Sequence, residues 1–280
     1  MDTIVQYTTD LVRAQGVRGL FNIQYVVFEG AVYVIEVSPR GSRTVPFLSK
    51  VSGVPMVDLA VRVGLGQPLR ELGFGVGLWP AQPLVAAKAP VFSMSKLTLV
   101  DTYLGPEMKS TGEVMGLGQT AAEALGKALL AAGSGLPTAN SAVLLSLADR
   151  DKAEAMPLVA GLASLGYELM ATEGTAVRIR EELGLPVDCI TKMLREGHPN
   201  VLDAIVSGRV GAVVNTVTGD RRPLLDGFYI RRAATERRIP CFTSLDTLRA
   251  ALAAVASSGC QTVHTVDEYR TQVGPLSLPV

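Results

Sequence analysis

Residues 20–47 bring together side chains that could bind a metal ion and a nucleotide. Gln24 and Glu36 offer an amide oxygen and a carboxylate, which are ligands that a hard divalent cation accepts. Arg40 and Arg43 follow closely, and guanidinium groups hold phosphate oxygens. The combination suits a magnesium–nucleotide site. A solvated sheet face with one Glu–Arg pair is the alternative, and spacing alone does not decide between the two.

Three further groups of polar residues follow strand-like runs in the second half of the chain. They are Ser146 and Lys152 after the first run, Thr172 and Thr175 around Gly174, and Asn215 with Thr216 after the fourth. In parallel α/β sheets, ligands bind beyond the carboxyl ends of the strands, where helices begin. Hydroxyls, backbone N–H groups and a lysine predict an anion site without a nucleophile. Helix capping is the alternative for each loop.

The first group needs a β-hairpin to position it. Apolar runs at 20–27 and 31–37 flank the turn residues 28–30. A two-residue Glu-Gly turn is poor, since type I′ turns prefer Asn-Gly or Asp-Gly, so we predict a three-residue loop ending in a left-handed Gly30. This register places Val27 opposite Ala31 and Gln24 opposite Val34.

Strand side chains alternate between two faces, which separates polar from apolar residues in this hairpin. The predicted working face carries Asn22, Gln24, Glu36 and Ser38. The predicted core face carries Phe21, Ile23, Tyr25, Val27, Tyr33, Ile35 and Val37.

The second group needs a parallel sheet. With 280 residues, of which 48% are hydrophobic, the chain can form two domains. A helix is expected at 57–65, a strand at 88–93, a helix at 120–131 and a break at 133–137. Beyond the break, strands are expected at 142–147, 167–171, 187–190 and 210–214, with helices at 151–165, 176–183 and 201–206. The alternation continues through 233–238, 240–244, 245–254 and 262–266. Such alternation predicts an α/β fold whose parallel sheet is covered on both faces.

Composition narrows the classes of function. The 26 basic and 26 acidic residues balance, which argues against a general role in binding nucleic acid or a membrane surface. The cysteines Cys189, Cys241 and Cys260 are far apart in apolar runs and are expected to be small core residues in a reducing compartment. The N-terminus does not resemble a signal peptide, and no run of about 20 apolar residues occurs. We expect a cytoplasmic protein, and a homo-oligomer stays open.

Two sequence runs carry a resemblance to a known family. IEVSPRGSRTVPFLSKVSGVP, at 35–55, and LGPEMKSTGEVMG, at 104–116, resemble the end of the second ATP-grasp unit of the carbamoyl-phosphate synthase large chain. The remainder resembles that family's methylglyoxal-synthase-like allosteric domain. The resemblance implies an ATP-grasp part at 1–117, a helix and linker at 118–137, and an allosteric domain at 138–280. A P-loop is excluded, because Met108 stands where that motif needs glycine.

The resemblance implies ATP-dependent phosphorylation of carbamate, for pyrimidine and arginine synthesis. Gln24 and Glu36 would bind Mg²⁺ or Mn²⁺ beside ATP, and Arg40 and Arg43 would contact phosphate. Ser38 stands where the family usually has asparagine, which weakens that metal contact. The partners would be the remaining N-terminal part of the large chain and a glutaminase small chain. This chain alone is expected to be inactive.

The resemblance also implies an effector, either UMP or a phosphoribosyl compound. The residues that would line its pocket are Ser146, Lys152, Thr172, Thr175, Lys192, Asn215 and Thr216. Ala89 replaces the glutamate with which some relatives bind ornithine, so ornithine activation is not expected. A regulatory module without catalysis is the first alternative. A methylglyoxal synthase is the second, but it needs a carboxylate base where Asn215 and Thr216 stand. Arg231 and Arg232 are expected on a solvated helix face.

Overall fold

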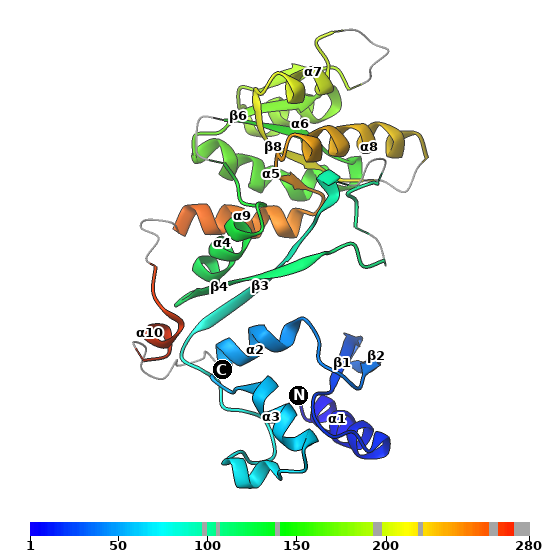
Figure 1. The fold of residues 1–280 in the computed structure, drawn as a ribbon. Helices are drawn as coiled ribbons and strands as arrows, with labels where there is room; N and C mark the ends of the chain where they lie inside the picture. The colour runs from blue at the N-terminus through cyan, green and yellow to red at the C-terminus, as the bar shows by residue number, and fades with distance from the viewer. Residues whose placement is uncertain are drawn as a thin grey trace. The chain divides into compact units, whose positions relative to one another are not determined.

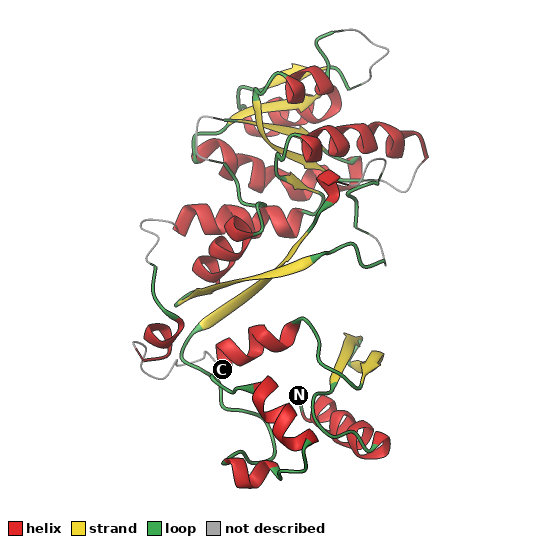
Figure 2. Ribbon diagram, in the orientation of Figure 1, coloured by secondary structure: helices red, strands yellow, loops and turns green. Residues whose placement is uncertain are grey.

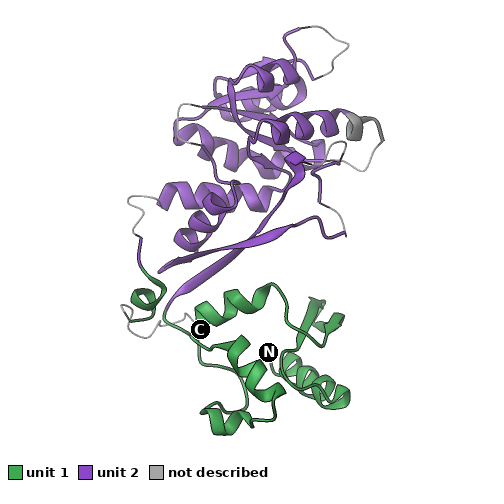
Figure 3. Ribbon diagram, in the orientation of Figure 1, with its two compact units in different colours: residues 1–83, 265–280 green, residues 84–264 purple. Residues whose placement is uncertain are grey.

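The structure is a computed structural model that describes residues 1–96, 100–104, 107–137, 141–192, 198–217, 221–257 and 263–271, without the side chains of 221–225. The chain forms two compact units (Figure 3). Unit 1 contains residues 1–83 and those from 265 onward, and unit 2 contains residues 84–264. The boundaries predicted at 117 and 137 divide the sequence by family region, whereas the two units are divided by spatial contact. The predicted boundaries therefore stay a prediction.

Unit 1 consists of short helices and one hairpin (Figure 1). Its elements are α1 (Asp2–Gln15), β1 (Asn22–Phe28), β2 (Ala31–Ser38), α2 (Thr44–Ser52), α3 (Met56–Gly64), the 3-10 turn η1 (Leu69–Leu72) and α10 (Val266–Thr271). Helix α3 agrees with the prediction at 57–65. No single described helix is long and apolar enough to cross a membrane. By length and composition alone, α2 and α3 together would qualify, with a bend of 109° between them.

The hairpin has a different register from the predicted one. Glu29 and Gly30 have φ angles of 49° and 79° and form a two-residue turn, so Phe28 pairs with Ala31. The prediction of a three-residue loop was wrong, because Glu29 adopts the left-handed conformation that we had expected only of Gly30. Ile35 is then an extra residue, since Gln24 pairs with Glu36 and Tyr25 with Val34. Next to the shorter turn, even-numbered residues of one strand lie opposite odd-numbered residues of the other. Beyond the β-bulge, even-numbered residues again lie opposite even-numbered ones, as predicted.

The bulge keeps the predicted working face together. Gln24 lies opposite Glu36 and Asn22 opposite Ser38, and directly opposed residues share a face. Of the predicted core face, Ile23 and Val37 form a half-buried pair. Tyr33 was assigned to the wrong face, since it lies opposite Val26 beyond the bulge.

Unit 2 begins with a two-stranded antiparallel ribbon, β3 (Val85–Val91) and β4 (Gly112–Gly118), followed by η2 (Met94–Lys96) in the connection and by α4 (Ala121–Ala131). Thr120 caps α4 by accepting a hydrogen bond from the Glu123 amide. The helix packs closely on β4, because a Cβ at Gly116 would lie 2.0 Å from the Ala124 carbonyl oxygen. Strand β4 therefore requires glycine where α4 crosses it.

A five-stranded parallel sheet forms the body of unit 2, as predicted (Figure 2). Its order is β7-β6-β5-β8-β9, with β5 (Ala142–Ser146), β6 (Glu168–Thr172), β7 (Asp188–Ile190), β8 (Val210–Asn215) and β9 (Cys241–Phe242). One face packs against α5 (Asp149–Ser164), α6 (Glu173–Leu183) and α9 (Leu245–Ser257). The other packs against α7 (Val201–Val206) and α8 (Arg221–Glu236).

Strand β5 shows why its run is apolar throughout. Val143 and Leu145 pack with the α5 face, while Leu144 packs with the α7 face, and all three side chains are fully buried. A strand covered on both faces needs apolar side chains at every position.

Three expectations for the sheet region need correction or limits. The alternation does not continue through 262–266, because 263–265 have no regular structure and α10 begins at Val266. Cys189 is exposed on β7, an outer strand of the described sheet, so it is not a core residue. Cys241 is a partly buried free thiol, and burial raises its pKa to about 12. Cys260 lies outside the described residues.

Candidate functional site

The hairpin in unit 1 brings together the predicted metal ligands. Gln24 and Glu36 are exposed and directly opposed on adjacent strands. Ser38 is buried, and its hydroxyl donates a hydrogen bond of 2.7 Å to Glu36 Oε1. Ser38 therefore orients the carboxylate, whatever else it contacts.

The predicted phosphate-binding arginines follow β2 directly. Arg40 is exposed, and its Nη1 donates to the Gly41 carbonyl oxygen at 2.9 Å. Arg43 is exposed at the N-cap position of α2. No described group of three His, Cys, Asp or Glu side chains could hold a metal ion. Glu36 and Gln24 fit Mg²⁺ or Mn²⁺ only as part of a shell that phosphate oxygens, water or other protein groups complete.

Large apolar side chains of the hairpin are unusually exposed. Their exposed fractions are 42% for Val26, 62% for Val27, 60% for Phe28, 53% for Tyr33, 42% for Val34 and 62% for Ile35. Val26 and Tyr33 lie on the working face, whereas Val27 and Val34 lie on the opposite face, so both faces of the hairpin expose large apolar side chains. Large exposed apolar surface is typical of interaction sites.

The second candidate site lies at the carboxyl ends of the parallel strands in unit 2. A cavity of about 510 Å³, which we call the phosphate pocket, is lined by Lys152, Thr172, Thr175 and Lys192 among the predicted residues. A smaller cavity of about 30 Å³ shares Leu147 and Lys192 with it and is lined by the other predicted residues, Ser146, Asn215 and Thr216. The sequence prediction thus falls on two adjoining cavities.

Lys152 supplies positive charge to the phosphate pocket. Its side chain is 15% exposed, and Nζ lies 2.7 Å from Asp149 Oδ1. The hydrogen bond from Lys152 lowers the pKa of Asp149, and the charges of Lys152 and Lys192 add to this effect. Gly174 leaves room for the lysine, because a Cβ there would lie 3.0 Å from Nζ.

The buried threonines hold the loop after β5. Thr175 Oγ1 accepts a hydrogen bond from the Leu147 amide at 3.3 Å, and Thr216 Oγ1 accepts one from the Ala148 amide at 2.8 Å. A hydroxyl that accepts from an amide still has its own hydrogen to donate to a ligand. Thr172 stands at the N-cap of α6 without a side-chain capping bond, so the capping alternative fails there.

Arg231 is a site residue that sequence reasoning placed wrongly. It is 0% exposed, and Arg232 is 9% exposed, so neither lies on a solvated helix face. Arg231 Nη1 donates to Asn215 Oδ1 at 2.7 Å. Its Nε and Nη2 donate to the two carboxylate oxygens of Asp101 at 2.8 and 2.5 Å. Arg231 also lines the small cavity.

A helical pattern could have revealed this arginine. Gly227, Ile230, Arg231 and Ala234 follow the i, i+3, i+4, i+7 spacing of one helix face, and Ile230 and Ala234 are buried. Arg231 therefore shares the stripe of α8 that faces the sheet. Asp101 gave no such signal, because it is an isolated acid in a connection.

Asp101 and Met94 tie the connection between β3 and β4 to helix α8. Burial opposes ionisation of Asp101, but its bonds with Arg231 and the Tyr103 amide, and the charges of Arg231 and Lys109, outweigh this and lower its pKa. Arg232 donates to the Met94 carbonyl oxygen at 3.0 Å and pairs with Glu236 at 2.8 Å.

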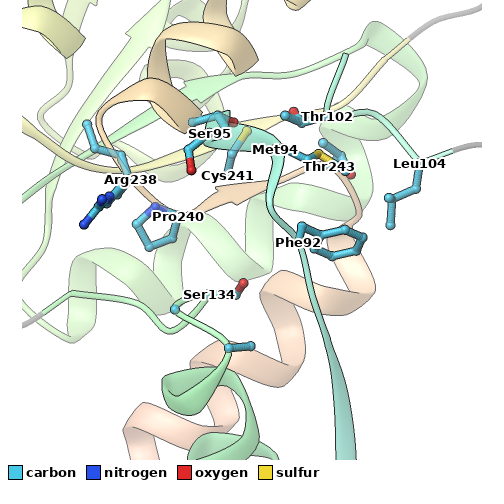
Figure 4. Close-up of a pocket in the computed structure, with 14 residues that line it drawn as sticks. Phe92, Met94, Ser95, Thr102, Leu104, Ser134, Arg238, Pro240, Cys241 and Thr243 are labelled. Atoms are coloured by element: carbon cyan, nitrogen blue, oxygen red, sulfur yellow. The ribbon is translucent and has the colours of Figure 1, made fainter. Parts of the chain in front are cut away.

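A third cavity of about 340 Å³ lies beside this connection (Figure 4). Its walls include Phe92, Met94, Ser95, Thr102 and Leu104 from the connection, and Arg238, Pro240, Cys241 and Thr243 from the segment that follows α8 and contains β9. None of the predicted site residues lines it. Thr102 Oγ1 is buried there without a hydrogen-bond partner among the described residues.

Two family models match the regions that carry the two sites. The model for the carbamoyl-phosphate synthase L chain, ATP binding domain, matches residues 1–72, which include the hairpin. The model for the MGS-like domain matches residues 154–243, which include most of the phosphate pocket. Together with the fold, they define a chain that joins part of an ATP-binding domain to an MGS-like domain.

A comparison over nearly the whole sequence gives the particular family. The chain is 53% identical over 278 residues, 99% of its length, to the carbamoyl phosphate synthase large chain of Thermomicrobium roseum. It therefore belongs with the carbamoyl phosphate synthase large chains and corresponds to the C-terminal part of such a chain. The chain spans 26% of the length of that relative.

Among solved structures, a methylglyoxal synthase from Elizabethkingia anophelis NUHP1 is similar at 18% identity, over 50% of this chain and 95% of that one. The TM-score is 0.34.

Proposed function

We propose that this chain is the regulatory and carbamate-phosphorylating end of a glutamine-hydrolysing carbamoyl phosphate synthase, and that its phosphate pocket binds a phosphorylated effector. The pocket carries this proposal. Lys152 and Lys192 line it beside buried hydroxyls, and the first turn of α6 begins at its edge without a side-chain cap. Backbone donors at a helix start and lysine charges suit a phosphate group.

The chain's own residues explain how a nucleoside monophosphate would be held. Lys152 is oriented by Asp149 and reaches over Gly174 to the start of α6, where it would pair with a phosphate oxygen. Thr175 and Thr216 would donate their hydroxyl hydrogens, since their oxygens already accept from backbone amides. The cavity of about 510 Å³ leaves room for a sugar and base.

Calorimetry with UMP and inorganic phosphate tests the pocket. Lys152→Ala should weaken UMP binding by about 30-fold or more, because it removes a charge-assisted contact of about 2 kcal/mol. Lys127→Ala is the matched control, since Lys127 also pairs with a carboxylate one helical turn away, at 2.6 Å. Absence of binding by any phosphate compound would favour a purely structural domain.

The hairpin would contribute to the phosphorylation of carbamate by ATP. Glu36, oriented by Ser38, and Gln24 would hold the metal ion, for which Mg²⁺ and Mn²⁺ are the candidates. When bound, such an ion neutralises charge on the phosphate oxygens. Arg40 and Arg43 would steady the transferring phosphoryl group, so the chain's part in catalysis is positioning and electrostatic stabilisation.

The hairpin would work only when other protein completes the site. Its exposed apolar residues support cover by the remaining N-terminal part of the large chain, and a glutaminase small chain would supply ammonia. The 280-residue chain should hydrolyse no ATP by itself. Adding the N-terminal part should restore carbamoyl phosphate synthesis, and Glu36→Gln should abolish it. Turnover by the chain alone that Glu36→Gln removes would refute this dependence.

A stand-alone regulatory module remains the second candidate, and the complementation experiment distinguishes it. The balanced charge and the two described free thiols support a cytoplasmic setting, which we also propose.

A further inference from the structure

Arg231 is a fully buried cation beside the phosphate pocket. Its guanidinium contacts Asn215 on one side, at 2.7 Å, and the Asp101 carboxylate on the other, at 2.8 and 2.5 Å. Asn215 Nδ2 in turn donates to the Ser146 carbonyl oxygen at 3.2 Å. Both of these residues line the small cavity that adjoins the pocket. One chain of hydrogen bonds therefore runs from Asp101 to the ends of β5 and β8.

Gly227 leaves the space that the guanidinium of Arg231 occupies. A Cβ at Gly227 would lie 2.6 Å from Arg231 Nη1 and 3.2 Å from Asn215 Oδ1. Glycine inside a helix costs about 1 kcal/mol relative to alanine. Gly227 is thus a cradle for the guanidinium, and it fixes which atoms Arg231 can reach.

The Asp101 carboxylate neutralises the positive charge of Arg231, which would otherwise attract an anion in the pocket. A buried cation needs a counter-ion, and here the carboxylate comes from the connection between β3 and β4, 130 residues away in sequence. Without Asp101, a phosphate bound in the adjoining pocket could serve as a counter-ion for Arg231, which lines the small cavity beside it. An anion in the pocket and Asp101 would then compete for the same cation.

We propose that Asp101 sets the anion affinity of the phosphate pocket through Arg231, and that binding of a phosphate compound loosens the segment that carries Asp101. This inference rests on the proposed function of the pocket. Coupling between two sites is reciprocal: if removing the Asp101 charge tightens binding, binding must weaken the hold on Asp101. Binding of an effector in the pocket then changes how firmly residues 100–104, which belong to the connection between β3 and β4, are held.

Calorimetry on the 280-residue chain tests the first half. Asp101→Asn should bind UMP and inorganic phosphate about fivefold more tightly, at the lower end of typical coupling. Asp188→Asn is the matched control, because it removes the same charge from a surface pair with Arg209, at the start of β7. Its affinity should stay within about twofold of the unmodified chain. A merely structural role for Asp101 predicts equal or weaker binding.

A double variant shows whether the gain needs the arginine. Asp101→Asn combined with Arg231→Met removes both charges, a replacement that buried pairs often tolerate. It should bind no more tightly than the unmodified chain. A double variant as tight as Asp101→Asn would overturn the role of Arg231.

Hydrogen exchange on the unmodified chain tests the second half without any variant. Amides of residues 100–104 should exchange faster when UMP is bound, and slower or unchanged exchange would overturn the proposed release. If the unmodified chain binds neither UMP nor inorganic phosphate, the proposed function itself fails. If it binds them but Asp101→Asn gains nothing, only this inference fails.

Discussion

The hairpin of unit 1 and the parallel sheet of unit 2 present their functional residues in opposite ways. Strand β5 is buried on both faces, with Val143, Leu144 and Leu145 at 0% exposure, and its polar residues gather at one end. The hairpin exposes apolar residues such as Ile35 and Phe28, at 62% and 60%, beside its polar ones. A complete sheet supplies its own rigid walls. In the proposed function, the hairpin supplies residues for a site that other protein completes.

The largest expected effect on stability comes from replacing one arginine in each of the two regions. Arg231→Met should destabilise unit 2 by about 3 kcal/mol, the lower end for a broken buried pair, because Asp101 keeps some contact with solvent. Arg40→Met, at an exposed position in the hairpin region, should change stability by less than about 0.5 kcal/mol. Urea unfolding measures both. Equal effects would contradict the contrast between a self-contained and an incomplete site.

The buried arginine also shows what the sequence could not predict. The strands of the parallel sheet were predictable because continuous apolar runs have one simple explanation. The ion pair of Arg231 was not. The helical stripe of α8 indicates that Arg231 faces the sheet, but its counter-ion Asp101 is 130 residues away and carries no such signal. A charged residue is assigned to the surface unless its partner is known.

The strand register of the hairpin could not be predicted, for a different reason. Its turn depends on Glu29 taking a φ of 49°, which local preference disfavours, and the bulge at Ile35 then compensates. The turn is one residue shorter than predicted and the bulge adds one residue, so the face shared by Gln24 and Glu36 was predicted correctly although the register was wrong. The positions of Ser146, Lys152 and Asn215 were predictable for a firmer reason, since strand ends meet at one edge of a sheet.

Glycines sharpen the comparison at a smaller scale. Gly227→Ala should destabilise unit 2 by about 1 kcal/mol, because overpacking against Arg231 costs more than the helix gains. Gly64→Ala in α3 should instead stabilise by up to about 1 kcal/mol, since a Cβ there meets nothing within 4 Å. Thermal unfolding followed by circular dichroism distinguishes the opposite signs. Stabilisation by Gly227→Ala would show that the cradle is not tight.

The pH dependence of unit 2 should contain a contribution from Asp101. Its pKa is lowered when folded, so the folded state binds this proton less readily than the unfolded state. The stabilisation is then complete above the unfolded pKa of about 3.9 and is lost as pH falls through the folded value. Urea unfolding of the unmodified chain and Asp101→Asn should differ most at neutral pH and converge in acid. A constant difference down to low pH would contradict the ion pair.

The smallest effects come from two serines that are matched except for their region. Ser38 ends β2 and Ser146 ends β5, with exposures of 5% and 4%. Ser38→Ala should cost about 0.5 kcal/mol of stability, because it loses one hydrogen bond to the exposed Glu36, and should leave UMP binding unchanged. Ser146→Ala should leave stability nearly unchanged and weaken UMP binding by about fivefold, the loss of about 1 kcal/mol of hydrogen bonding.

Calorimetry and urea unfolding on the same two variants decide the matter, because each variant is the control for the other. If Ser146→Ala binds UMP normally, the hydroxyl serves the strand end and not the ligand, and Ser146 is removed from the predicted phosphate site. If Ser38→Ala alters UMP binding, the hairpin and the phosphate pocket are energetically linked. That result would remove the distinction between a site that the chain completes by itself and one that it only begins.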